Sequence, residues 1–153
     1  MKKVLCIAAV FFLVACAGRM IQFEQYSMAM TQKVAADSSI YLGTDETFQG
    51  VIWLNPILKE ENVKIESVKF IENYGVYYFC AEGFKNVWVI EPEEDGVTGE
   101  YEALDVTPDD PNDIMKGISF SRYGSKENTC VKFRYNGKEI FIDRKGKLNE
   151  KCN

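Results

Sequence analysis

The sequence of 153 residues contains no histidine. Mechanisms that use an imidazole as general base, and metal sites that use one as ligand, are therefore excluded. A serine or cysteine nucleophile would lack its usual activating base, and the Gly-x-Ser-x-Gly turn of serine hydrolases does not occur. The sequence also lacks a Gly-rich phosphate loop and any Cys-x-x-Cys pair. Without a recognisable catalytic set, we predict that the protein is not an enzyme.

Proline is scarce, with four residues, and no internal repeat or low-complexity tract occurs. A wholly disordered or collagen-like chain is excluded, because 46% of the residues are hydrophobic and can form an ordinary core. The length predicts one domain. The formal net charge of -5 argues against a nucleic-acid partner, because phosphate contact needs a concentrated basic surface. We predict neither a nucleic-acid partner nor a cofactor.

The N-terminus carries a short apolar run behind two positive charges. Lys2 and Lys3 precede residues 4–14, which are all apolar. A helix that spans a bilayer needs about 20 apolar residues, so this run is too short to cross it. Its proportions are those of the hydrophobic region of a secretory signal peptide.

The residues that end this run, Leu-Val-Ala-Cys at 13–16, resemble the lipobox of bacterial lipoproteins. The resemblance implies removal of residues 1–15 and lipidation of Cys16, so that the membrane becomes a partner through this anchor. Ala17 stands where an Asp often signals retention in the inner membrane, which implies a periplasm-facing protein on the outer membrane of a Gram-negative host. The alternative is an ordinary secretory signal with a chance cysteine.

Charge is unevenly distributed along the rest of the chain. Residues 86–115 contain ten carboxylates and no Lys or Arg, whereas residues 116–153 contain ten basic and four acidic residues. The acidic segment is either a solvated loop or a surface for a basic partner, and it lacks the spacing of a calcium loop, so we predict no metal site. The basic residues either face anionic lipid headgroups or lie on solvated strand faces. The acidic candidates for partner contact are Glu93, Glu94, Asp95, Asp109 and Asp110.

Aromatic residues are concentrated between residues 74 and 88. They form either a β-sheet core with tyrosine hydroxyls at its rim or a face that binds a partner, since Tyr and Trp dominate interface energetics. Under the second interpretation, Tyr77 and Trp88 are the candidate contacts.

Three cysteines outside the lipobox and signal peptide compete for one disulfide in an oxidising compartment. Cys80 lies in an apolar run and behaves as a small core residue. Cys130 and Cys152 have polar neighbours, which favours a disulfide between them. A last strand that continues the sheet beyond residue 143 would lie on the far side from Cys130 and argues against this pairing.

Strand patterns dominate from residue 38 onward. Asn136-Gly137 supplies the two positive φ angles of a type I′ turn, which pairs Arg134 with Glu139 and Phe133 with Ile140. The runs 76–81 and 86–90 are apolar on both faces and predict central strands, whereas 100–106 predicts a polar edge strand.

The sequence therefore predicts a mainly β fold, with α+β as the alternative. We expect one antiparallel domain of about seven to nine short strands, with at most one or two short helices. The expected divisions are a signal peptide at 1–15, a lipidated cysteine and tether at 16–22, and the β-rich domain at 23–153. The leading hypothesis is a non-enzymatic binding module, such as an inhibitor, an immunity or exclusion protein, or an accessory of an envelope assembly. The alternatives are a structural lipoprotein without a discrete ligand and a carboxylate-dependent enzyme on cell-wall glycan.

Overall fold

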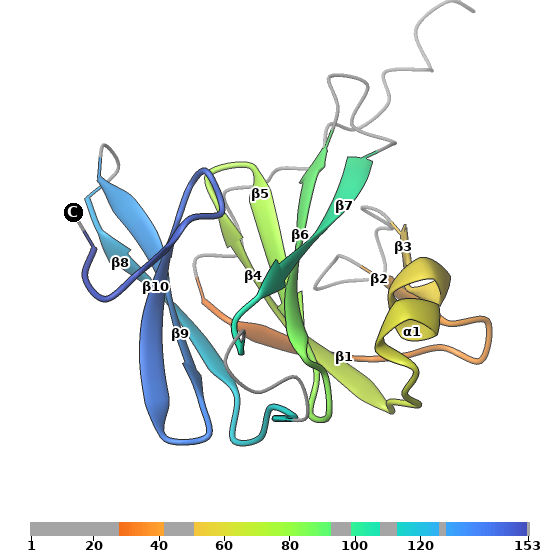
Figure 1. The fold of residues 1–153 in the computed structure, drawn as a ribbon. Coiled ribbons are helices and arrows are strands. Elements are labelled where there is room, and N and C mark those ends of the chain that lie inside the picture. Colours follow the sequence, from red (N-terminus) through yellow and green to blue (C-terminus); the bar gives the residue numbers. More distant parts are fainter. Residues whose placement is uncertain (1–27, 42–50, 93–98, 108–112, 126–127, 153) are drawn as a thin grey trace, which may run out of the picture.

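The computed structural model describes residues 28–41, 51–92, 99–107, 113–125 and 128–152 (Figure 1). These residues form eleven short strands and one helix, and every strand pair is antiparallel. The predicted mainly β fold class is confirmed, although there are more strands than expected. The predicted signal peptide, Cys16 and the tether lie outside the described residues.

The central sheet has five strands in the order β1-β4-β5-β6-β7. The middle strand β5 is buried along its whole length, as its uninterrupted apolar sequence predicts. The polar strand β7 lies at one edge of the sheet, also as predicted. The strands are β1 (Met30–Lys33), β4 (Ser67–Asn73), β5 (Val76–Cys80), β6 (Asn86–Pro92) and β7 (Gly99–Asp105).

The second sheet has four strands, β8 (Ser119–Gly124), β9 (Thr129–Tyr135), β10 (Lys138–Asp143) and β11 (Leu148–Asn149), in the order β11-β10-β9-β8. The hairpin of β9 and β10 has the predicted register, with Arg134 opposite Glu139 and Phe133 opposite Ile140. Its turn has φ angles of 49° at Asn136 and 75° at Gly137, as a type I′ turn requires.

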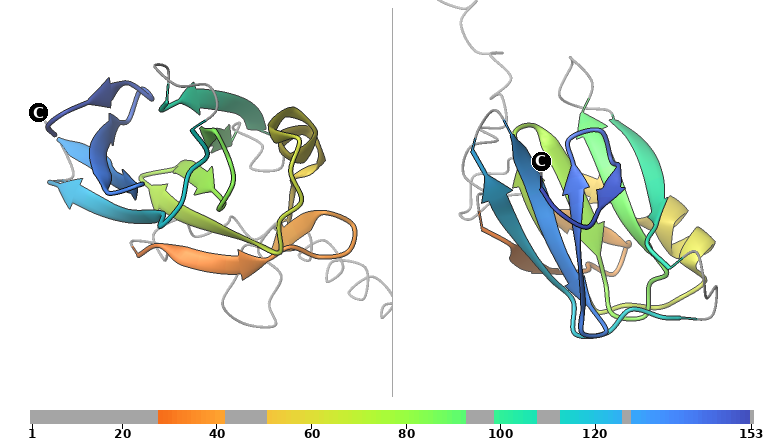
Figure 2. Two further views of the ribbon diagram at one scale, coloured as in Figure 1. Left: turned by 60° about the horizontal axis from the view of Figure 1, so that its bottom comes forward. Right: turned by 60° about the vertical axis from the view of Figure 1, so that its left-hand side comes forward.

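The remaining elements are the hairpin of β2 (Ser39–Tyr41) and β3 (Val51–Trp53) and the helix α1 (Asn55–Glu61). Figure 2 shows the five-stranded sheet in the middle, with the four-stranded sheet on one side of it and α1 with the small hairpin on the other. The described strands do not close into a barrel. This arrangement buries both faces of the central strands.

Side-chain hydrogen bonds join the two larger sheets. The Lys69 ammonium donates to the carbonyl of Ile118 at 2.6 Å, and the Tyr78 hydroxyl donates to the carbonyl of Asp143 at 3.2 Å. Burial raises the pKa of the Tyr78 hydroxyl above its ordinary range, so the hydroxyl remains a donor. Because buried polar groups need partners, these bonds fix how the sheets meet.

One buried ion pair reinforces the same contact. The Glu72 carboxylate is 2% exposed and lies 2.7 Å from the Arg122 guanidinium, which also donates to the Glu72 carbonyl at 2.8 Å. β1 pairs with β4 only as far as Phe70, so Arg122 supplies a donor to β4 beyond the end of its neighbouring strand. The pair therefore holds β8 beside the end of β4.

The predicted disulfide between Cys130 and Cys152 is confirmed. The last strand does continue the meander on the far side of β10, as the objection to this pairing assumed. The chain after Asn149 nevertheless crosses in front of β10 and returns to β9 (Figure 1). The disulfide thereby fixes the C-terminal segment over the four-stranded sheet.

Removing the disulfide should destabilise the domain. Closing a loop of this length constrains the unfolded chain, and Cys152→Ser should therefore lower the free energy of unfolding by about 3 kcal/mol. Guanidinium denaturation followed by fluorescence measures this change. Dithiothreitol should destabilise the wild-type protein by a similar amount and leave the variant unaffected. Equal stability of the oxidised wild type and the variant would contradict the prediction.

Candidate functional site

The structure places the aromatic candidates in the core. Tyr77 is 1% exposed and Trp88 is 3% exposed, so neither side chain reaches a partner. Both lie on the face of the central sheet that α1 and the small hairpin cover. The sequence patterns around these residues do not predict that another element covers this face. The core interpretation of these aromatics replaces the partner-contact one. The acidic candidates Glu93, Glu94, Asp95, Asp109 and Asp110 lie outside the described residues.

Trp88 owes its position to a buried carboxylate at the end of α1. Glu61 is 5% exposed and accepts a hydrogen bond from the Trp88 indole N–H at 2.8 Å. It also accepts the backbone N–H groups of Lys85 at 2.7 Å and Asn86 at 3.1 Å, and the Asn86 side-chain amide at 2.9 Å. Four donors thus satisfy the carboxylate, which ties α1 to the beginning of β6.

Two further polar groups of the core are also unavailable for catalysis. Cys80 is completely buried beside Met115, and burial raises the pKa of its thiol, which keeps it protonated and unreactive. The Glu72 carboxylate is occupied by Arg122 and by the N–H of Gly75 at 2.6 Å. In the described part of the chain, no group of three or more Cys, Asp or Glu residues could hold a metal ion.

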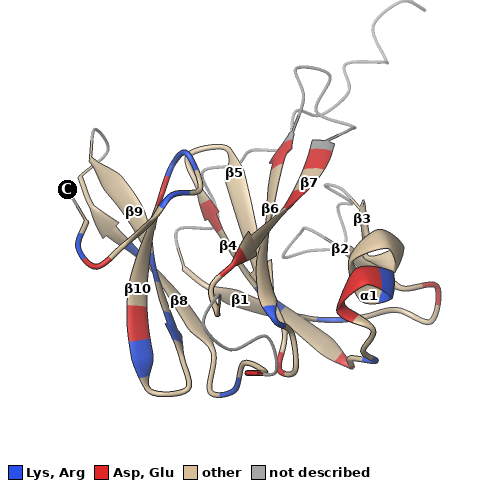
Figure 3. Ribbon diagram, in the orientation of Figure 1, with Lys and Arg blue, Asp and Glu red and all other residues tan. Residues whose placement is uncertain are grey.

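The exposed edge of the central sheet is the first candidate surface. We define the β7 surface as Trp53 together with the exposed carboxylates of Glu91, Glu100 and Glu102. Glu91 lies directly opposite Glu100 across β6 and β7, and no Lys or Arg within the described ranges forms an ion pair with any of the three. Figure 3 shows this acidic end of β6 and β7 in red.

Trp53 is the apolar part of the β7 surface and lies on the other side of the edge from the carboxylates. Tyr101, which contacts Trp53, alternates with Glu100 and Glu102 along β7 and therefore points to the opposite face. Its side chain is 53% exposed, and its backbone carbonyl accepts a hydrogen bond from the Tyr101 hydroxyl at 3.0 Å. This bond attaches β3 to β7, so Trp53 is held beside the edge strand. Among the described strands, β7 pairs only with β6, and its other edge lies on the outside of the molecule (Figure 2). An edge of this kind offers unpaired backbone groups to another chain.

The basic residues divide into paired and unpaired groups. Lys132 and Arg134 both pair with Glu139, at 3.2 Å and 2.6 Å, and Lys138 pairs with Asp113 at 3.4 Å. We define the cationic turn as Arg144, Lys145 and Lys147, between β10 and β11. All three are exposed, and no described carboxylate lies within ion-pair distance of them. The cationic turn is the second candidate surface.

No protein family, no curated protein and no solved structure matches the chain. The described ranges contain no helix that is long and apolar enough to cross a membrane.

The role of Trp88 can be separated from that of an exposed tryptophan. Trp88→Phe keeps most of the apolar volume but removes the N–H that the buried Glu61 carboxylate accepts. The free energy of unfolding should fall by about 1 to 3 kcal/mol, since a charged acceptor loses one donor. Trp53→Phe is the matched control and should stay within about 0.5 kcal/mol of wild type. Urea denaturation gives both values, and equal effects of the two changes would contradict the assignment of Trp88 to the core network.

Proposed function

We propose that the chain is a small lipoprotein of the bacterial envelope whose β-rich domain binds a partner protein and catalyses no reaction. The sequence at 1–17 supports an outer-membrane anchor on Cys16, with the domain facing the periplasm. The β7 surface supports binding. An inhibitor, an immunity or exclusion protein, or an accessory of an envelope assembly would all act in this way.

The observation that carries the proposal is an exposed tryptophan held beside an open edge strand. Tryptophan is among the residues that contribute most to binding energy when they become buried in an interface. The side chain of Trp53 is more than half exposed, and the Tyr101 hydrogen bond fixes its backbone. A partner that covers Trp53 would gain apolar contact without having to order this strand first.

The carboxylates of the β7 surface indicate the chemistry of the partner. Like charges directly opposite each other destabilise a sheet, and Glu91 faces Glu100 in this way. Basic side chains on a partner would relieve the repulsion, and the acidic surface would speed their encounter. We therefore propose a partner that spans the β7 edge, with Lys or Arg against the carboxylates on one face and an apolar or aromatic contact for Trp53 on the other.

The carboxylates favour binding over hydrolysis of cell-wall glycan. Glycosidases need one carboxylate that donates a proton and a second that attacks or activates water. The buried carboxylates of Glu61 and Glu72 are occupied by hydrogen-bond donors. The pair Glu91 and Glu100 lies on exposed strand positions, where neither group has the apolar surroundings that a general acid needs.

The anchor is tested by labelling cells with a fatty-acid analogue that carries a clickable group. The wild-type protein should incorporate the label, and Cys16→Ser should abolish incorporation because the thioether cannot form. Cys80→Ser controls for nonspecific loss and should leave labelling intact. Persistent labelling of the Cys16→Ser protein would exclude the lipobox interpretation.

The binding surface is tested by quantitative cross-linking and capture from envelopes, with wild type and variants compared side by side. Trp53→Ala, and separately Glu100→Lys combined with Glu102→Lys, should each weaken the captured complex by about thirtyfold, the effect of a 2 kcal/mol contact. Glu66→Lys changes an exposed carboxylate outside the β7 surface and serves as the control. Recovery of the same partner at the same level from all variants would refute this assignment of the surface.

A further inference from the structure

We propose that the cationic turn is a contact site for anionic phospholipid headgroups and holds the domain against the bilayer that carries it. The inference rests on the lipid anchor proposed above, but it uses residues outside the β7 surface. It assigns a ligand to a group of three described cations that form no ion pair, and an orientation to the anchored domain.

The turn concentrates positive charge without a compensating side chain. Its nearest carboxylate, Asp143, accepts the backbone N–H groups of Lys145 at 2.8 Å and Lys147 at 2.9 Å. Asp143 therefore shapes the turn from within, while the three cationic side chains extend into solvent. Counting Asp143, the turn still carries a net charge of about +2, which suits an anionic surface.

An aromatic ring lies beside the turn. The Arg144 guanidinium donates to the carbonyl of Tyr74 at 3.4 Å, and its centre lies 5.9 Å from the Tyr74 ring. Arg122 stacks on the same ring at 4.6 Å. Tyr74 is half-buried, and tyrosine is a residue that favours the boundary between headgroups and water. The cationic turn thus adjoins a site suited to the membrane interface.

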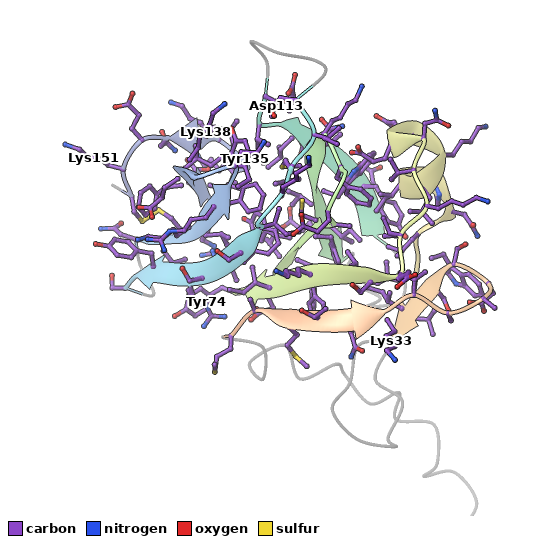
Figure 4. The ribbon with its side chains drawn as sticks, turned by 90° about the horizontal axis from the view of Figure 1, so that it is seen from below. Lys33, Tyr74, Asp113, Tyr135, Lys138 and Lys151 are labelled. Atoms are coloured by element: carbon purple, nitrogen blue, oxygen red, sulfur yellow. A yellow bond between two sulfur atoms is a disulfide. The ribbon has the colours of Figure 1, made fainter. Side chains whose placement is uncertain are left out.

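The first described residues join the sheet at the end where Tyr74 and the cationic turn lie. β1 runs antiparallel to β4, and its first residue, Met30, lies opposite Phe70. The preceding residue Met28, which is 78% exposed, therefore lies toward the end of β4 that leads into the turn at Tyr74. In Figure 4, Tyr74 lies near the beginning of β1, whereas Lys33 marks the other end of that strand.

The length of the connection limits how far this end can lie from the membrane. Eleven residues separate Cys16 from Met28. Even a fully extended connection reaches only about 40 Å, so Met28 stays within that distance of the anchor and the cationic turn can reach the headgroups. A weak contact is sufficient here, because the anchor gives the headgroups a high effective concentration. Each cation near an anionic surface should increase the occupancy of the contact about fivefold.

The experiment measures lysine accessibility in the complete lipidated protein. The protein is reconstituted into neutral phosphatidylcholine vesicles and into vesicles that contain phosphatidylglycerol. A water-soluble acylating reagent then modifies exposed amines, and mass spectrometry gives the rate at each lysine. Lys145 and Lys147 should react about fivefold more slowly in the anionic vesicles, and high salt should restore their rates. Lys59 on α1 should react equally in both.

Variants test whether charge causes the protection. Arg144→Gln should reduce the protection of Lys145 about fivefold, because it removes one cation from the contact. Lys138→Gln removes a cation that is already paired with Asp113 and should leave the protection unchanged. Circular dichroism establishes that both variants remain folded.

Three outcomes would overturn the inference. The first is equal reactivity of Lys145 in the two kinds of vesicle, and the second is equal protection of every lysine. The third is protection of Lys145 in native envelopes but not in vesicles, which would indicate that an acidic protein covers the turn instead. Fatty-acid labelling of Cys16 separates these results from failure of the anchor. A labelled protein with an unprotected turn refutes only the headgroup contact, whereas an unlabelled protein refutes the anchor itself.

Discussion

The fold depends on how β4 ends. β1 covers only the first part of this strand, so the backbone beyond Phe70 needs another partner. The Arg122 guanidinium supplies it by binding both the carbonyl and the carboxylate of Glu72. The same carboxylate accepts the N–H of Gly75, which closes the turn into β5. Because removing one member of such a buried pair leaves an uncompensated charge, the turn, β4 and β8 form one unit.

Ion pairs of this kind decide which charged side chains remain available at the surface. The sequence places ten carboxylates at residues 86–115 and ten basic residues at residues 116–153, which suggests two opposed patches. The fold neutralises much of the basic segment. Arg122 is largely buried in its ion pair with Glu72, and the cations on β9 and β10 pair with Glu139 and Asp113. The described cations of this segment that form no ion pair are Lys116, Lys151 and the three residues of the cationic turn, which are the only ones grouped together. Net charge along the sequence is therefore a poor guide to the charge that a partner meets.

Local chemistry explains which features could be predicted. The Asn136-Gly137 turn specifies its hairpin register through two backbone angles, and the uninterrupted apolar run of β5 specifies a strand covered on both faces. The burial of Trp88 and of Arg122 depends on contacts with α1 and with β4, which are distant in sequence. Pro56 is suited to the end of a strand but also to the first turn of a helix, and here it lies in the first turn of α1, which begins at Asn55. No short-range pattern distinguishes these outcomes, because the partner that buries each side chain is fixed only by the tertiary fold.

The two candidate surfaces meet different physical requirements. The chain enters through β1, whereas the β7 surface lies at the opposite edge of the same sheet, about 19 Å away at ordinary strand spacing. An anionic bilayer attracts the cationic turn and repels the carboxylates of β7. The two groups lie on the same side of the central sheet, because a Cβ at Gly146 in the turn would meet Leu104 of β7 at 3.3 Å. Attraction of the turn and repulsion of the carboxylates therefore oppose each other and limit the orientations in which the turn contacts headgroups. A contact through the cationic turn would thus require an orientation that keeps the neighbouring carboxylates away from the bilayer. Trp53 alternates with the buried Ile52 and Leu54, so its side chain points away from the central sheet and would remain accessible to a partner in the periplasm.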